Sequence, residues 1–366
     1  MKFTMQREEL LPALQSVSGV VERRQTLPIL SNVLLSVGPK GMRFTATDME
    51  VELVATVDKP IKESGEVTLP ARKLLDICRA LPEGAAVRLE ADGDRAVVTS
   101  GKSRFTLATL AAREFPLIEM TDRIVEFRLP RSDLKHLLDQ TAFAMAQQDV
   151  RYYLNGLLIE VGSGRVRAVA TDGHRLALAD VVVQAKSDSP VQVIVPRKGV
   201  MELVRLLTEA DEDVSVQLTR NHIRVDLGAL QFTSKLIDGK FPDYDKVIPP
   251  EGGSPLLADR ESLRQGLIRA SILSNEKYRG VRITLAKNSL RALAHNPDQE
   301  EAEEEIEVAY GGEELEIGFN VSYLLDALAI IRTKEVRITM TDPTTSALIL
   351  PEPAAACKYV VMPMRL

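Results

Sequence analysis

The sequence predicts an α+β fold in which three successive units each combine two helices with antiparallel sheets. The hydrophobic pattern alternates between helical and strand spacing along the whole chain. Landmarks also recur at a nearly constant separation, with Asp48 and Asp172 124 residues apart, Pro70 and Pro196 126 apart, and Pro116 and Pro242 126 apart. The 366 residues therefore divide into three repeated units, which we place at residues 1–120, 121–250 and 251–366.

The first unit opens with a predicted helix over residues 6–21, because Leu10, Leu14, Val17 and Val21 recur at helical spacing. Alternating apolar residues and turn signals predict the strands that follow, at residues 30–37, 41–47, 50–57 and 65–70. A second helix follows through Leu74, Leu75, Cys78 and Leu81, and the last strand of the unit is expected at residues 105–110.

The second and third units repeat this order. In the second unit, residues 127–130 are expected to open a helix through 134–145, followed by strands within 155–183, a strand at 193–196 and a helix through 200–207. In the third unit we expect helices at 260–273 and 324–331, and strands at 280–285, 289–294, 305–308, 335–341, 346–350 and 358–362.

Composition bounds the class of protein. With 45% hydrophobic and 27% charged residues, the chain can bury a sizeable core, and no apolar run approaches the roughly 20 residues that span a bilayer. Cys78 and Cys357 have no metal-ligand spacing and are expected to be small core residues of a protein in the reducing cytoplasm. The N-terminus shows no secretion signal. A net charge of -6 argues against general electrostatic binding of nucleic acid, but allows basic residues gathered on one face.

The motifs of catalysis are missing. Asp172 and His174 suggest a hydrolase pair, but no nucleophile stands in a matching context, and the four histidines lack metal spacing. Neither a phosphate loop nor a dinucleotide fingerprint is present. We therefore expect no catalytic residues, no metal and no cofactor, and interpret Asp172-Gly173 as a turn. The seven acidic residues within 298–307 indicate either a solvated edge or a face for a basic partner.

Seven long motifs carry a further signal: QDVRYYLNG, VATDGHRLAL, VPRKGVMEL, FTSKLIDGKFPDY, ILSNEKYRGVR, EIGFNVSYLLD and YVVMPMRL. Together they resemble one family, the bacterial DNA sliding clamps, which are the beta subunits of DNA polymerase III holoenzyme. The resemblance covers the chain from Met1 to Leu366 and includes the threefold repeat. It implies a head-to-tail homodimer that closes into a ring around double-stranded DNA and confers processivity on a polymerase. A hydrolase and a protein-binding repeat scaffold without DNA encirclement are the competing hypotheses.

The resemblance implies two sets of contacts that assemble the ring and hold DNA. Sequence-independent DNA contacts are expected from Arg24, Arg72, Lys73, Gln147, Gln148, Tyr152, Tyr153, Arg197 and Lys198. The dimer interface is expected to involve Lys73, Arg104, Phe105, Leu107, Ile272, Leu273, Glu300, Glu303 and Glu304. Gln147 departs from the histidine that is common in the family at this position.

The resemblance also implies a groove for short apolar peptides of partner proteins. The matching positions are Leu154, Thr171, Gly173, His174, Arg175, Leu176, Pro242, Val247, Asn320, Tyr323, Ser346, Val360, Val361, Met362, Pro363, Met364 and Arg365. Methionines there can repack around different peptides. Lys246 departs from the family's arginine and offers only a point charge. The expected partners are the clamp loader, the replicative polymerase catalytic subunit, and other polymerases and repair proteins, with no membrane.

Overall fold

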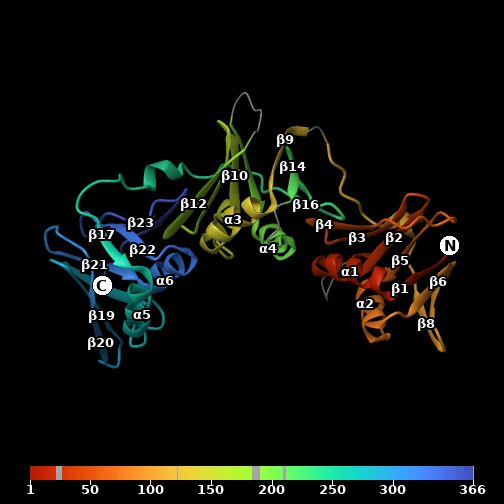
Figure 1. Cartoon of the computed structure of the whole chain (residues 1–366), viewed down its shortest axis with the longest axis horizontal. Helices are drawn as coiled ribbons and strands as arrows, with labels where there is room; N and C mark the ends of the chain where they lie inside the picture. The colour runs from red at the N-terminus through yellow and green to blue at the C-terminus, as the bar shows by residue number, and fades with distance from the viewer. Residues whose placement is uncertain (22–26, 122, 184–189, 209–211, 366) are drawn as a thin grey trace. The chain divides into compact units, whose positions relative to one another are not determined.

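The structure, a computed structural model, describes residues 1–366 apart from 22–26, 122, 184–189, 209–211 and 366 (Figure 1). The chain forms two compact units. Unit 1 comprises Met1–Ser132 and Lys198–Leu236, and unit 2 comprises Asp133–Arg197 and Ile237–Leu366. Within the described residues, no helix is long and apolar enough to cross a membrane.

Unit 1 contains two antiparallel sheets. The four-stranded sheet has the order β1 (Lys2–Gln6), β6 (Ala86–Asp92), β7 (Arg95–Ser100) and β8 (Ser103–Ala108). The eight-stranded sheet has the order β5 (Gly65–Pro70), β2 (Asn32–Gly38), β3 (Gly41–Thr47), β4 (Val51–Val57), β16 (Leu230–Lys235), β15 (His222–Asp226), β14 (Asp213–Thr219) and β9 (Arg123–Pro130).

Unit 2 has the same construction. Its eight-stranded sheet has the order β13 (Val191–Pro196), β10 (Gly156–Gly162), β11 (Arg165–Thr171), β12 (Arg175–Val182), β24 (Cys357–Val361), β23 (Ala347–Glu352), β22 (Glu335–Thr339) and β17 (Leu256–Asp259). Its four-stranded sheet has the order β20 (Glu301–Glu307), β19 (Ser289–His295), β18 (Gly280–Ala286) and β21 (Leu315–Asn320).

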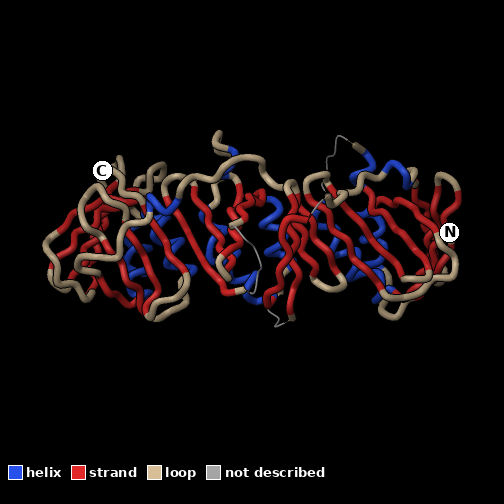
Figure 2. The backbone as a smooth tube through the Cα atoms, turned by 90° about the horizontal axis from the view of Figure 1, so that it is seen from above, coloured by secondary structure: helices blue, strands red, loops and turns tan. Residues whose placement is uncertain are grey.

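Six α-helices lie in the described part of the chain, and Figure 2 shows them (blue) beside the strands (red). They are α1 (Arg7–Val17), α2 (Ala71–Ala80), α3 (Arg131–Thr141), α4 (Arg197–Leu206), α5 (Arg260–Ser271) and α6 (Val321–Ile330). Side-chain caps begin α5 and α6, where Asp259 and Asn320 each accept a hydrogen bond from a backbone N–H of the first turn. Within each unit, α1 contacts α2, and α5 contacts α6.

Each eight-stranded sheet is shared by two successive repeats. Strand β4 of the first repeat pairs with β16 of the second, and β12 of the second repeat pairs with β24 of the third. The remaining strands of the first and third repeats form the two four-stranded sheets. This sharing explains why the chain contains three repeats but folds into two compact units.

The predicted repeat is confirmed, with two helices and eight strands in each copy in the described residues. Some boundaries differ. The first helix begins at Arg7 after strand β1, and its regular part ends at Val17 rather than 21. Residues 127–130 belong to β9, which pairs with β14 instead of opening a helix. These differences arise because pairing with a strand distant in sequence overrides local pattern.

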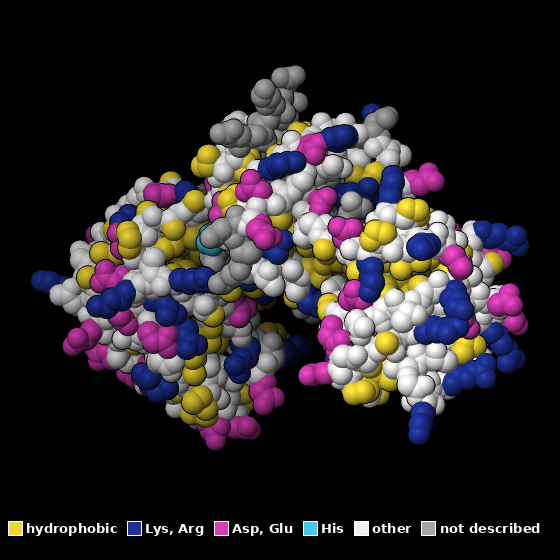
Figure 3. Space-filling view, turned by 45° about the vertical axis from the view of Figure 1, so that its right-hand side comes forward, with side chains coloured by type: hydrophobic (Ala, Val, Ile, Leu, Met, Phe, Trp, Pro, Cys, Tyr) yellow, Lys and Arg dark blue, Asp and Glu magenta, His cyan; other side chains and the backbone are white. Residues whose placement is uncertain are grey.

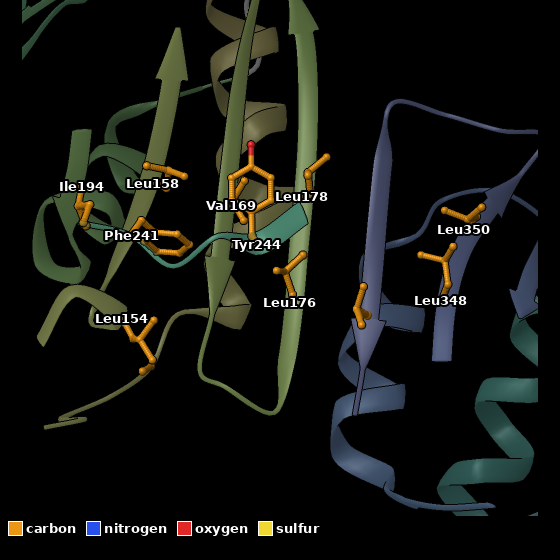
Figure 4. Packing of buried hydrophobic residues seen from close by; sticks show 12 residues of the cluster. Leu154, Leu158, Val169, Leu176, Leu178, Ile194, Phe241, Tyr244, Leu348 and Leu350 are labelled. Carbon is orange, nitrogen blue, oxygen red and sulfur yellow. The ribbon is translucent and has the colours of Figure 1, made fainter. Parts of the chain in front are cut away.

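A buried hydrophobic cluster of unit 2 extends on both sides of the junction of β12 and β24. Figure 4 shows its side chains, which come from β10 to β13, from β23 and β24, and from the segment that includes Phe241 and Tyr244. Cys78 and Cys357 are buried free thiols, as expected, and burial raises the pKa of Cys78 to about 11. Both therefore pack as apolar residues at neutral pH.

Candidate partner-binding, DNA-contacting and dimer surfaces

The turn between β11 and β12 is fixed by its own side chains. Asp172 Oδ1 accepts hydrogen bonds from the backbone N–H groups of His174 and Arg175, at 2.9 and 3.0 Å. Thr171 Oγ1 donates to the carbonyl of Arg175 at 2.6 Å and accepts from the N–H of Gly173 at 3.1 Å. Gly173 has φ of 88°, which glycine adopts without strain. The turn thus has a single conformation and presents His174 to solvent.

Arg175 connects this turn to two helical segments. Its Nε donates to Asp172 Oδ2 at 3.1 Å, its Nη2 donates to the carbonyl of Phe143 at 2.9 Å, and its Nη1 pairs with Asp326 of α6. The guanidinium lies 4.8 Å from the ring centroid of Tyr323, which itself stacks against His174. Burial raises the pKa of Tyr323. Five donors in a planar fork make this arrangement possible only for arginine.

The C-terminal segment continues from β24 along the same turn. The N–H of Met362 donates to the carbonyl of His174 at 2.9 Å, and the N–H of Met364 donates to the carbonyl of Gly318 at 2.8 Å. These bonds hold both methionine side chains half-buried beside the turn. The segment therefore lies beside the turn at which the groove is predicted.

The predicted groove residues come together in unit 2. Leu154, Leu176 and Val360 belong to the buried cluster of Figure 4, and Val247 is 37% exposed. The half-buried members are Thr171, Gly173, Arg175, Asn320, Tyr323, Ser346, Met362, Pro363 and Met364; His174, Pro242 and Arg365 are exposed, and Val361 is buried. Lys246 is 80% exposed and forms an ion pair with Asp243 at 2.8 Å. The surface combines an apolar base with a few fixed polar groups.

The hydrogen bonds of Asp172 argue against the hydrolase hypothesis, in which this residue would be the catalytic carboxylate. Both oxygens of Asp172 accept hydrogen bonds, two from backbone N–H groups of the turn and one from the Arg175 side chain, so its carboxylate is engaged in holding the turn. Among the described residues, no group of three His, Cys, Asp or Glu side chains could hold a metal. Asp172 therefore acts as a turn-forming residue.

A short loop before β10 carries four of the predicted DNA contacts. Gln147, Gln148 and Tyr152 are exposed, and Tyr153 is half-buried, with the two tyrosine rings 5.8 Å apart and edge to face. Arg151 holds the loop, because it pairs with Asp149 at 2.9 Å and donates to the carbonyl of Asp172 at 3.2 Å. Arg151 also lowers the pKa of Asp149 to about 2. The loop is thus tied to the groove turn by one side chain.

The other predicted DNA contacts lie at the beginnings of helices. Arg72 and Lys73 are exposed in the first turn of α2, and Arg72 donates to the carbonyl of Val21 at 2.8 Å. Arg197 donates to the carbonyl of Met145 at 3.3 Å, and Lys198 forms an ion pair with the buried carboxylate of Asp48 at 2.5 Å. Arg24 lies outside the described residues.

Five of the predicted dimer residues lie on two edge strands, and Lys73 lies in α2. Arg104, Phe105 and Leu107 belong to β8, the edge strand of the four-stranded sheet of unit 1. Glu303 and Glu304 belong to β20, the edge strand of the four-stranded sheet of unit 2, and pair with Arg291 and Arg269. Glu300 precedes β20 and accepts from Asn296 Nδ2 at 2.6 Å. Ile272 ends α5 and is 71% exposed, whereas its neighbour Leu273 is half-buried.

Basic and acidic side chains are interspersed on the face seen in Figure 3, as expected for a chain with a modest net charge. The sequence analysis overlooked a hollow of about 360 Å³ beside Met364 and Arg365, lined also by Asn275, Tyr278, Leu293 and His295. Its residues come from three separate segments, so periodicity gave no sign of it.

Comparison with known proteins places the chain in a family. Three models of the DNA polymerase III beta subunit match in succession: the N-terminal domain at residues 1–119, the central domain at 128–243 and the C-terminal domain at 245–365. The chain belongs to the DNA polymerase III beta subunit family. Two of its relatives are the beta sliding clamps of Pseudomonas aeruginosa, 53% identical, and of Escherichia coli K12, 50% identical, each over 100% of both chains.

Solved structures of beta subunits share this fold. A crystal structure of the DNA polymerase III subunit beta from P. aeruginosa has a TM-score of 0.98 at 53% identity, with 100% of both chains covered. A second P. aeruginosa clamp structure, bound to griselimycin, has a TM-score of 0.96, again at 53% identity and full coverage. The resemblance found in the sequence is therefore confirmed for family and fold.

Proposed function

We propose that this chain is a DNA sliding clamp. Two copies join head to tail into a closed ring around duplex DNA, and the ring tethers the replicative polymerase without catalysing a reaction. The beta sliding clamps that it resembles over full length support this function. The observation that supports the ring is that β8 and β20 are end strands of the two four-stranded sheets, each with one side unpaired.

These edges are counterparts of edges that already pair within the chain. Counting the eight strands of each repeat, β4 and β12 are the fourth strands of the first and second repeats, and β20 is the fourth strand of the third. Likewise, β16 and β24 are the last strands of their repeats, and β8 is the last strand of the first. Since β4 pairs with β16 and β12 with β24, the same rule pairs β20 of one copy with β8 of another.

Charge and exposure favour this pairing. Strand β20 exposes Glu301, Glu303, Glu305 and Glu307, whereas β8 exposes Arg104. An acidic edge opposes pairing with a second copy of itself and accepts a basic partner. Exposed Ile272 and half-buried Phe105 supply apolar area for the centre of such an interface.

The DNA contacts belong to the same proposal. Arg24, Arg72, Lys73, Gln147, Gln148, Tyr152, Tyr153, Arg197 and Lys198 would contact phosphates without reading sequence. A closed ring needs little affinity for DNA, which agrees with a net charge of -6. Lys198 would have to exchange its partner Asp48 for a phosphate, so we expect it to contribute less than Arg72 and Lys73.

The groove of unit 2 would receive short apolar peptides from the clamp loader, the polymerase catalytic subunit, and other polymerases and repair proteins. Its apolar base, fixed turn and half-buried methionines support this. Division into domains at 1–120, 121–250 and 251–366, and a cytoplasmic location, complete the proposal.

The ring is tested by its topology on DNA. The protein, loaded on nicked circular DNA, should remain bound through gel filtration at high salt and should be lost when the circle is cut. Changing Arg72 and Tyr152 together to Ala should reduce retention during sliding but leave the dimer intact, because neither residue belongs to the predicted interface. Equal retention on circular and linear DNA would contradict encirclement and favour the scaffold.

A further inference from the structure

Unit 1 contains a hollow of about 220 Å³ that the proposed function does not use. Its lining includes Thr47 and Met49 from the turn after β3, Pro116 from a loop, and His222 and Lys235 from the hairpin of β15 and β16. Small-molecule and cofactor sites usually enclose roughly 300–1,000 Å³. This hollow is smaller, and its size suits one or two side chains of a peptide.

The turn that carries Met49 has the hydrogen bonds of the groove turn. Thr47 Oγ1 donates to the carbonyl of Val51 at 2.9 Å and accepts from the N–H of Met49 at 3.0 Å. Asp48 Oδ1 accepts from the N–H groups of Glu50 and Val51, at 2.8 and 2.7 Å. All four bonds recur 124 residues later in the turn of Thr171, Asp172 and Gly173.

The strand side of the hollow also corresponds to the groove. The N–H of Lys235 donates to the carbonyl of Glu50 at 2.8 Å, as the N–H of Met362 donates to that of His174 at 2.9 Å. In unit 1, His222 pairs with Lys235 across the hairpin of β15 and β16. In unit 2, Ser346 holds the corresponding position, one residue beyond the pair of Ala347 and Val361. Pro116 holds the place of Pro242. Five lining residues thus occupy the positions of five groove residues, namely Thr171, Gly173, Pro242, Ser346 and Met362.

The apolar part of the lining is exposed and strained. Met49 has φ of 75°, a left-handed conformation that its counterpart Gly173 adopts freely, and its side chain is 41% exposed. Leu117, on the loop after Pro116, is 56% exposed. Strained residues gather at binding sites, and methionine adapts its shape to an apolar partner.

The polar part of the lining favours binding of a carboxylate group. His222 Nδ1 is buried and has no hydrogen-bond partner within the described residues. Lys235 is exposed, and its ammonium likewise makes no ion pair in the part of the chain that the structure describes. Burial lowers the pKa of His222, and the neighbouring cations Lys235 and Arg224 lower it further. Glu119 lies on the opposite loop and is the single acidic residue among those that line the hollow.

We propose that this hollow is a second peptide site, which takes one apolar side chain of an extended partner segment and binds an adjacent carboxylate through the ammonium of Lys235. The choice of a peptide as occupant rests on the function proposed for the groove in unit 2. The ammonium of Lys235 and the exposed Met49 distinguish the ligand, because the groove has Ser346 and Met362 at the positions of His222 and Lys235.

Methyl NMR on the intact protein tests this site. The full chain, labelled with carbon-13 at methionine methyl groups, is titrated with the blocked peptide acetyl-Gly-Asp-Leu-Gly-amide, and Met49 is assigned from the signal lost in Met49→Leu. We expect the Met49 methyl signal to shift and saturate at millimolar peptide. Replacing Asp by Asn, or Leu by Ala, in the peptide should weaken the effect by about tenfold.

Variants locate the site and separate it from the groove. Lys235→Met places the groove's residue in the hollow and should weaken binding at Met49 about tenfold, with Lys235→Glu weakening it further. The methyl signals of Met362 and Met364 report on the groove in the same spectra and on correct folding of each variant. An unmoved Met49 signal, or a shift that survives Lys235→Glu, would overturn the proposal. A failure of the groove would appear separately, as loss of response at Met362 and Met364 to a polymerase-tail peptide.

Discussion

Glycine is required at position 173 both by the backbone conformation and by the side chain packed against it. Its φ of 88° suits glycine, and an added Cβ would meet the guanidinium nitrogens of Arg151 at 2.9 and 3.0 Å. Arg151 in turn holds the loop of Tyr152 and Tyr153. One side-chain contact therefore connects the groove turn with a predicted DNA-contacting loop.

We expect Gly173→Ala to lower the free energy of unfolding by about 1 kcal/mol from backbone strain and to weaken partner-peptide binding as Arg151 is displaced. Gly164→Ala is the matched control, because Gly164 has φ of 72° but an added Cβ would have no atom nearer than 3.9 Å. Urea unfolding and calorimetric peptide titration measure the two effects. Equal loss of peptide affinity in both variants would show that Arg151 does not matter to the groove.

Glu52 is a second residue whose environment predicts a measurable effect. It is buried, and its Oε2 accepts a hydrogen bond from the N–H of Ile118, a residue that lines the hollow of unit 1. Burial raises the pKa of Glu52 above its ordinary value of 4.5, although Arg224 and Arg43 oppose the shift. The carboxyl group of Glu52 therefore binds its proton more tightly in the folded state than in the unfolded state.

The sign of the pH effect follows. As pH rises from 4.5 through the folded pKa, Glu52 must ionise in a buried site, so its contribution to the free energy of unfolding falls. Glu52→Gln removes this contribution, so we expect its stability relative to the parent to be higher at pH 7 than at pH 4. Urea unfolding across this range measures it, with the exposed neighbour Glu50→Gln as control. If the free energy of unfolding changed with pH identically in the parent and in Glu52→Gln, the shifted pKa of Glu52 would be contradicted.

At the scale of elements, the C-terminal segment after β24 is a separable part of the predicted groove. Its backbone is held by the bonds from Met362 to His174 and from Met364 to Gly318. Both dimer edges, β8 and β20, are separate elements of other sheets. Groove and dimer are therefore separable by mutation.

Deleting residues 362–366 should abolish binding of a polymerase-tail peptide and leave the dimer unchanged. The deletion removes one wall of the groove together with both backbone bonds. A shorter deletion of 365–366 keeps both bonds and should retain most of the affinity. Calorimetric titration and sedimentation of the two proteins provide the measurement. Undiminished affinity after the longer deletion would place the groove elsewhere.

The elements also show what local pattern can predict. The six helices follow from apolar spacing, and the Asp172 turn follows from the preference of Asp and Gly for turns. Strand β1 and the joining of β4 to β16 were not predicted, because strand order depends on contacts between residues distant in sequence. The groove residues lie in separate segments, so only family resemblance assembled them before the fold was known. The pairing of Lys198 with Asp48 gave no signal in the sequence.

At the scale of the whole molecule, the proposed dimer depends on a few apolar side chains beside two sheet edges. Ile272 is 71% exposed in the single chain, so it contributes little to the stability of the chain alone. Its role, if β8 and β20 join, is at the centre of the interface.

Replacing Ile272 and Leu273 together with Ala should yield a folded monomer, because central interface residues each contribute about 2 kcal/mol or more to association. Val182→Ala is the control, since Val182 is 88% exposed at the end of β12, which belongs to a different sheet from β8 and from β20. Sedimentation velocity at low micromolar concentration separates monomer from dimer. An undiminished dimer would show that Ile272 and Leu273 lie outside the interface.

The sharing of sheets between repeats has a mechanical consequence for a ring built in this way. The seams β4 to β16 and β12 to β24 are closed by the chain itself, so their strands meet at a high effective concentration whatever the amount of protein. The proposed seam between β8 and β20 would join the corresponding strands of two copies without such a tether. We therefore expect the ring to part there first under dilution or when a loading protein pulls it open.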